Sequence, residues 1–154
     1  MKRLMIGVWA ALLVPFGIAG ISGGPTAPWG HVVFHLGYIT AAGIAVFLLL
    51  RLRRNATQKM VRLLGLLTAG AQLLFIVGQL GELLIIALQH GAHPRTEALD
   101  DARHELAAMA LTFPGLFGSA LLLLALTAAV VVASRRAPIV DLNHYTRSVV
   151  PGKE

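Results

Sequence analysis

Four long apolar runs separated by short polar segments dominate the chain, over residues 4–22, 31–50, 61–89 and 106–133. About 20 apolar residues in an α-helix are enough to cross the roughly 30 Å hydrocarbon core of a bilayer. A spanning segment must also satisfy its own backbone hydrogen bonds, which an α-helix does. The pattern therefore predicts an all-α polytopic membrane protein. Residues 1–136 form a four-helix transmembrane bundle, and residues 137–154 form a polar tail.

Three features qualify this pattern. Lys2 and Arg3 precede the first run, as they would in a secretory signal peptide, but no clear A-x-A cleavage site follows, so we expect a retained span. The third run is longer than the hydrocarbon core and is expected to tilt or protrude. Pro114 next to Gly115 predicts a bend in the fourth run.

The composition supports lipid as the surrounding medium. Hydrophobic residues make up 56% of the chain and charged residues 13%, whereas soluble domains average about 45–50% and about 25%. The chain contains no cysteine, which excludes disulfides, thiolate metal sites, iron–sulfur clusters and cysteine nucleophiles. It also contains no phosphate-binding P-loop.

The basic residues predict the orientation. Two of them, Arg95 and Arg103, lie on the side opposite the termini, while eleven lie on the side of the termini: Lys2, Arg3, Arg51, Arg53, Arg54, Lys59, Arg62, Arg135, Arg136, Arg147 and Lys153. Short loops rich in Lys and Arg stay in the cytoplasm. We therefore expect a protein integral to the cytoplasmic (cell) membrane with both termini cytoplasmic. Because the positive charges flank the spans, the pI of about 10.8 does not indicate nucleic-acid binding.

Histidines gather on the predicted outer side, at His31, His35, His90, His93 and His104. Histidine is the commonest metal ligand and also binds haem iron. We expect His35 and His104 to form an inner cofactor-binding pair, with His31, His90 and His93 as further metal ligands. In the alternative interpretation, the loop histidines are simply solvated, and no H-E-x-x-H motif is present.

A polar stripe runs along the third span and consists of Gln72, Gln79, Glu82 and Gln89. At about 100° per residue these side chains share one face, which should point into the bundle. Glu82 is the only acid of that apolar run, and we assign it as a possible metal ligand, proton relay or quinone-site residue. The alternative is an interfacial carboxylate that only seals the bundle.

The layout of four spans with histidines on one side, rather than any stretch of sequence, resembles that of b-type membrane cytochromes. The likeness implies haem b, and a copper or zinc ion is the other cofactor considered. We therefore expect a small membrane subunit that binds a metal ion or haem for electron transfer or metal handling. Because little of the chain lies outside the spans, a binding component is expected rather than an enzyme.

Two further functions stay open. One is a cofactor-free accessory subunit of a larger membrane complex, such as a respiratory one, in contact with other membrane subunits or with copies of itself. The other is a small transporter or channel component in which Gln72, Gln79 and Glu82 line a polar path. In each case the lipid bilayer is the first partner and nucleic acid is not one.

Overall fold

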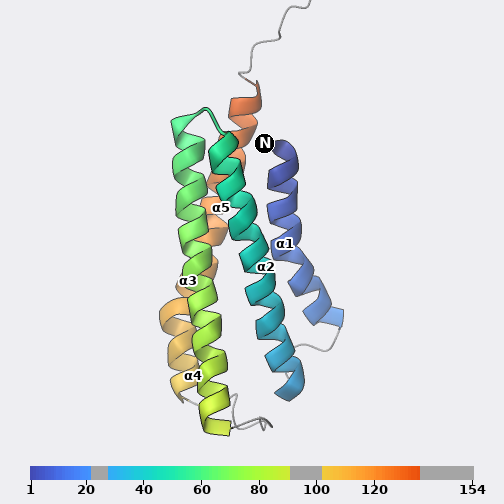
Figure 1. Cartoon of the computed structure of the whole chain (residues 1–154), viewed down its shortest axis with the longest axis vertical. Helices are drawn as coiled ribbons and strands as arrows, with labels where there is room; N and C mark the ends of the chain where they lie inside the picture. Colours follow the sequence, from blue (N-terminus) through green and yellow to red (C-terminus); the bar gives the residue numbers. More distant parts are fainter. Residues whose placement is uncertain (22–27, 91–101, 136–154) are drawn as a thin grey trace, which may run out of the picture.

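The computed structural model describes residues 1–21, 28–90 and 102–135, and these ranges contain helices and no strand. Its elements are α1 (Lys2–Ile21), α2 (Pro28–Asn55), α3 (Lys59–His90), α4 (Ala102–Ala107), the π-helical turn η3 (Ala108–Thr112) and α5 (Phe113–Arg135). The last three follow one another without a break and run alongside α3 (Figure 1). The all-helical prediction is thus confirmed for the described ranges.

Three helical segments are long and apolar enough to cross a membrane: Val32–Asn55, Lys59–Leu88 and Glu105–Arg135. They correspond to the second, third and fourth predicted spans. The first predicted span corresponds to α1, whose last side chains lie outside the described ones, so its crossing of the membrane stays a prediction. The helix α2 continues to Asn55 rather than ending at residue 50. Arginine favours helices, so Arg51, Arg53 and Arg54 extend α2 instead of breaking it.

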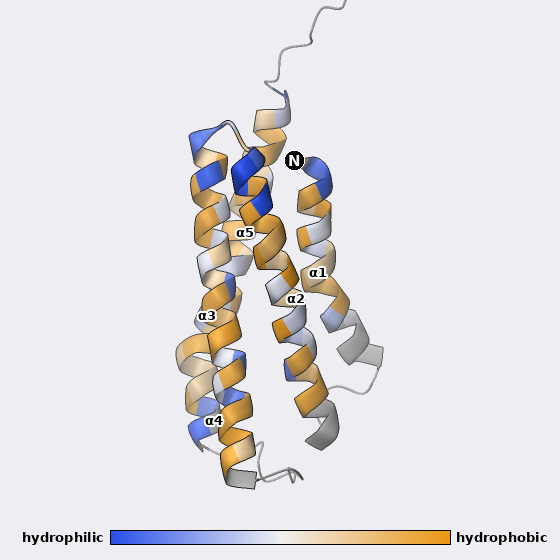
Figure 2. Cartoon of the chain, viewed as in Figure 1, coloured by the Kyte–Doolittle hydropathy of each residue, from blue (hydrophilic) through white to orange (hydrophobic). Residues whose placement is uncertain are grey.

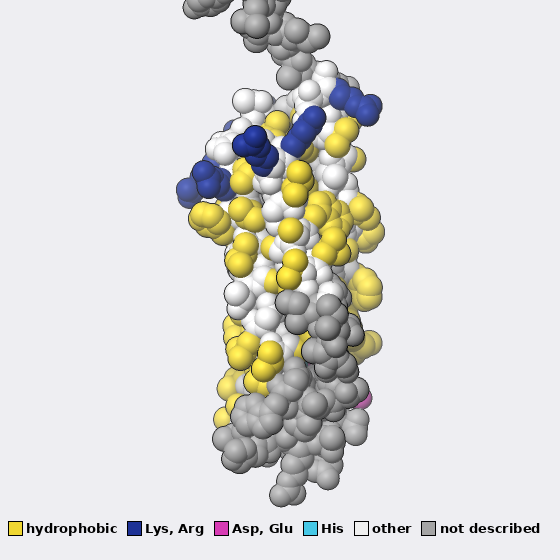
Figure 3. Space-filling view, turned by 90° about the vertical axis from the view of Figure 1, so that its right-hand side faces the viewer, with side chains coloured by type: hydrophobic (Ala, Val, Ile, Leu, Met, Phe, Trp, Pro, Cys, Tyr) yellow, Lys and Arg dark blue, Asp and Glu magenta, His cyan; other side chains and the backbone are white. Residues whose placement is uncertain are grey.

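Charge divides the bundle into two ends. Lys and Arg side chains gather where α1 begins, α2 meets α3 and α5 ends (Figures 1 and 3), and we call this the basic end. It contains Lys2, Arg3, Arg51, Arg53, Arg54, Lys59, Arg62 and Arg135. The other end, where α3 ends and α4 begins, we call the polar end because blue polar positions lie in its part of α2, α3 and α4 (Figure 2).

On the face drawn in Figure 3, hydrophobic side chains cover much of the described surface below the basic end. Large aliphatic side chains stay open to the surroundings, with Leu88 77%, Leu121 69% and Ile6 68% exposed. Contiguous apolar surface of this extent is typical of proteins whose solvent is lipid. The molecule is therefore built as a membrane protein.

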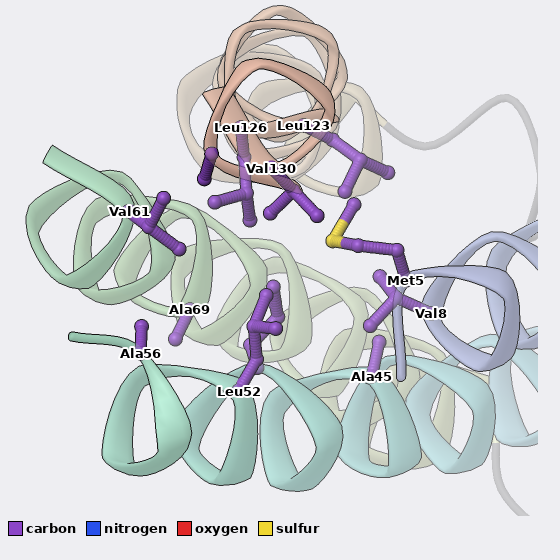
Figure 4. Packing of buried hydrophobic residues seen from close by; sticks show 12 residues of the cluster. Met5, Val8, Ala45, Leu52, Ala56, Val61, Ala69, Leu123, Leu126 and Val130 are labelled. Atoms are coloured by element: carbon purple, nitrogen blue, oxygen red, sulfur yellow. The ribbon is translucent and has the colours of Figure 1, made fainter. Parts of the chain in front are cut away.

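Near the basic end the helices meet in an aliphatic core (Figure 4). It consists of Met5, Val8, Ala45, Leu49, Leu52, Ala56, Val61, Ala69, Leu123, Leu126, Val130 and Ala133. Apolar burial gives helices little reason to associate inside lipid, so close van der Waals packing has to hold them together. The alanines in this set allow that close approach.

Just before Pro114, where the sequence predicts a bend, the helix contains the π-helical turn η3. Proline has no N–H for the preceding turn, and its ring collides with the carbonyl four residues earlier. A wider π-turn relieves both problems. Two glycines allow α3 to pack closely against η3 and α5. A Cβ on Gly78 of α3 would lie 2.6 Å from the Thr112 nitrogen, and a Cβ on Gly115 of α5 would lie 2.5 Å from the Phe75 nitrogen.

Candidate functional site

His35 lies on α2, one helical turn after His31, and its side chain is only 2% exposed. Its ring Nδ1 lies 2.8 Å from the Gln79 Oε1 of α3. An amide oxygen only accepts hydrogen bonds, so this contact requires the ring proton on Nδ1. The other ring nitrogen, Nε2, faces the Glu82 Oε2 at 3.7 Å. The imidazole is therefore oriented by one side chain and directed at a carboxyl group.

Glu82 is 4% exposed, and three side chains surround its carboxyl group. The Gln79 Nε2 donates to Oε1 at 3.4 Å, and the Thr112 hydroxyl donates to the same oxygen. Together with His35 these side chains form what we call the buried polar cluster: His35, Gln79, Glu82 and Thr112. It joins α2, α3 and η3, so residues far apart in the sequence meet at a single point.

Local helix geometry explains why these residues meet. Gln79 and Glu82 are three residues apart and share a face of α3. Gly78, beside Gln79, lets the backbone of η3 approach α3 closely enough for Thr112 to reach the carboxyl group. The extra residue of the π-turn sets the rotation of Thr112 relative to α4.

The predicted inward orientation of the polar stripe is confirmed for Gln72, Gln79 and Glu82, which are 1%, 3% and 4% exposed. Aromatic rings separate the cluster from the aliphatic core. Phe34 packs edge-on against Tyr38 with ring centroids 4.4 Å apart, and Tyr38 packs against Phe75 at 5.7 Å. The cluster therefore sits in a water-poor environment in which electrostatic interactions are strong.

The cluster contains an acid and a base that can share one proton. With that proton on the carboxyl group the pair is neutral, and with it on the imidazole the pair is an ion pair of zero net charge. Gain or loss of one more proton leaves a net charge inside the membrane. The 3.7 Å between Nε2 and Oε2 slightly exceeds a hydrogen bond, so a small side-chain movement or a bridging water would complete the path.

The structure describes only part of the predicted histidine site. His31, His90 and His104 belong to α2, α3 and α4, but their side chains lie outside the described ones, and His93 lies outside the described residues altogether. The expected pairing of His35 with His104 therefore stays a prediction. Within the described part of the chain, no three His, Asp or Glu side chains are grouped to hold a metal ion.

Sequence reasoning did not identify Thr112 and did not foresee that Gln79 connects His35 to Glu82. One signal for Thr112 was present, because it directly precedes Phe113-Pro114-Gly115, where a helix in lipid is disturbed. Hydroxyl groups near such sites often satisfy freed polar groups. The π-turn that aims Thr112 at Glu82 has no comparable signature in the residues themselves.

No family model, no curated protein and no solved structure matches the chain. The functional argument therefore rests on the side chains of this molecule. Among them the buried polar cluster combines titratable groups, burial and mutual contact, which are the features expected of a functional site inside a membrane.

Proposed function

We propose that this protein is a small component of the cell membrane that takes up and releases a proton at its buried polar cluster, as part of a transport path. The contact of the Glu82 carboxyl group with the His35 imidazole, both buried within membrane-spanning segments, carries this proposal. Gln79 and Thr112 hold the two groups in position. Gln72, which is also buried, extends the row of polar side chains from the cluster toward the middle of α3.

The topology that goes with this function has four spans and both termini in the cytoplasm. The basic end supports it, since α1, α2, α3 and α5 all place Lys or Arg there (Figure 3). Under the positive-inside rule this end faces the cytoplasm. The buried polar cluster then lies in the half of the membrane nearer the outside, within reach of protons from that side.

A purely structural role explains the cluster less well. An ionisable side chain inside the hydrocarbon costs about 2.5–3.5 kcal/mol even on the lenient insertion scales. Neutral glutamine or asparagine would hydrogen-bond the helices together without that cost. An acid facing a base is instead the arrangement used in proton relays of pumps and transporters.

Proton flux into liposomes containing a pH-sensitive dye tests the proposal. Glu82→Gln keeps the size of the side chain and its hydrogen bonds to Gln79 and Thr112 but cannot exchange a proton, so flux should fall to the level of empty liposomes. The matched control is Glu105→Gln, an exposed acid of α4, which should conduct as the wild type does. Equal flux through Glu82→Gln and the wild type would refute the proposal.

A second candidate function is the binding of haem b or of a copper or zinc ion for electron transfer. The path of the backbone favours it, because the starts of α2 and α4 and the end of α3 place His31, His104 and His90 at the polar end, where His35 also lies (Figure 1). Haem needs one or two histidines, whereas zinc needs three or four ligands.

Absorption and elemental analysis of gently extracted protein test this second candidate. A Soret band, or stoichiometric copper or zinc, should be present, and His35→Ala or His104→Ala should remove it. His144→Ala, in the tail, serves as the matched control. A colourless protein free of metal after extraction and after loading with haem would rule this candidate out.

A further inference from the structure

An apolar cavity of about 230 Å³ lies between α1, α2, α3 and α5, apart from the contact between His35 and Glu82. Aromatic side chains form part of its wall: Trp9 of α1, Tyr38 of α2 and Phe117 of α5. Its remaining lining is almost wholly aliphatic, so water is a poor occupant, since an ordered buried water needs two to four polar partners.

The amide oxygen of one polar side chain that lines this cavity lacks a hydrogen bond among the described residues. Gln72 lines the cavity and is 1% exposed, and its amide oxygen has no hydrogen-bond partner among the described residues. A buried acceptor without a donor is costly, and in lipid no water is at hand to supply one. The Gln72 oxygen itself has almost no accessible surface, and a small rotation of its amide group into the cavity would let it accept from an O–H or N–H group there.

The position of the cavity defines how a molecule would reach it. Gln72 lies 13 residues after Lys59 in α3, or roughly 20 Å from the start of that helix at 1.5 Å per residue. That is deep within a hydrocarbon core of about 30 Å. Leu13 and Phe117, which also line the cavity, are 57% and 63% exposed on the lipid-facing surface. Access is therefore sideways from the bilayer, between α1 and α5.

The size of the cavity fits a single substituted ring. An apolar cavity of about 150 Å³ inside a protein is enough to bind benzene. The present cavity is larger, and its aromatic walls favour a flat molecule. We propose that it binds a lipid-soluble phenol or quinol ring, whose hydroxyl group donates a hydrogen bond to the amide oxygen of Gln72. This inference does not depend on proton transfer at the buried polar cluster.

The fluorescence of Trp9, which lines the cavity, provides the test. The chain has two tryptophans, so Trp29→Phe leaves Trp9 as the single reporter. Liposomes containing this full-length protein are titrated with 4-bromophenol and, separately, with bromobenzene, whose bromine also quenches on contact but which has no hydroxyl group. After correction for partition into lipid, 4-bromophenol should bind about fivefold to tenfold more tightly, which is what one buried hydrogen bond provides.

Substitutions then assign the binding to this cavity. Gln72→Leu should make the two probes bind equally. Ala120→Phe adds bulk at the exposed edge of the cavity without entering the packed interior and should abolish saturable quenching by both. Ala125→Phe, at an exposed position of α5 that does not line the cavity, should change neither.

The comparison of the two probes needs no substitution at Gln72, so misfolding of that variant cannot hide the answer. Equal affinity of the two probes for Trp29→Phe protein would overturn the proposal and indicate an acyl chain as the occupant. Absence of saturable quenching by either probe would overturn it too, since another helix or a second copy would then fill the cavity. Loss of proton flux in Glu82→Gln has no bearing on either result.

Discussion

The two ends of the bundle are held together by different means. At the basic end, aliphatic side chains such as Leu49, Leu52 and Leu126 are fully buried against one another. At the polar end, the same helices meet through His35 and Glu82, whose neighbours are hydrogen-bonding groups. The aliphatic interface requires only close packing of complementary shapes. The polar interface is stable only when every buried polar atom has a hydrogen-bond partner.

This difference separates stability from function within one small molecule. Aliphatic packing tolerates exchange for other apolar groups of similar volume, but it has no chemistry to offer. The polar cluster tolerates fewer substitutions, because each one leaves a buried polar atom without a partner, but it contains groups that can exchange protons. We therefore expect substitutions in the aliphatic core to alter stability and those in the cluster to alter activity.

The largest effect on stability should come from Leu126→Ala in the aliphatic core. Leu126 is 0% exposed, and the cavity left by its truncation should lower the free energy of unfolding by about 3 kcal/mol. Unfolding in detergent micelles, followed by circular dichroism, measures it. Leu124→Ala on the lipid-facing side, where Leu124 is 57% exposed, should have a much smaller effect. Equal losses would mean that the core is not the stabilising region.

The second-largest loss of stability should come from Gly78→Ala, which tests how tightly α3 and η3 are packed. The new Cβ would lie 2.6 Å from the Thr112 nitrogen, so the helices must separate at a cost of about 2 kcal/mol. Gly81→Ala is the matched control, since nothing lies within 4 Å of the added atom. Because Thr112 would also move away from Glu82, Gly78→Ala should in addition reduce proton flux. An unchanged flux would contradict the close coupling of these two helices.

A smaller effect is expected for the interaction of His35 with Glu82. In a double-mutant cycle with His35→Leu and Glu82→Gln, the coupling free energy should be about 1 kcal/mol, within the range measured for polar pairs in membrane proteins. Each single variant should nevertheless lose proton flux completely. Zero coupling, measured by the same unfolding experiment, would show that the two side chains do not interact.

The smallest change in stability is expected for Thr112→Val, which removes one hydroxyl group at nearly constant shape. The hydrogen bond from Thr112 to Glu82 should contribute about 0.6 kcal/mol, an average value for such bonds in membranes. Thr40→Val is the comparison, because Thr40 is exposed and donates only to the Leu36 carbonyl of its own helix. A loss of flux in Thr112→Val alone would show that the hydroxyl positions the carboxyl group.

The sequence predicted the second, third and fourth spans because lipid restricts what an apolar run of this length can do. It also predicted that Gln72, Gln79 and Glu82 face inward, since the three lie in an unbroken stretch of α3 where 100° per residue holds. The partner Thr112 could not be placed in this way, because η3 contains an extra residue and shifts the angle. The meeting of His35 with Gln79 depends on how far α2 and α3 slide past each other, which periodicity does not report.

The π-turn also changes what the loss of one residue from this segment would do. Deleting one alanine from Ala108–Thr112 would restore an ordinary α-helix. Because a π-turn closes i→i+5 hydrogen bonds, its one extra residue is absorbed within the turn, and Ala102–Ala107 would keep nearly the same rotation relative to α5. A deletion in the regular α-helical part of α5 has no such turn to absorb it, and it would rotate everything before it by about 100°, exchanging one whole face of α4 for another.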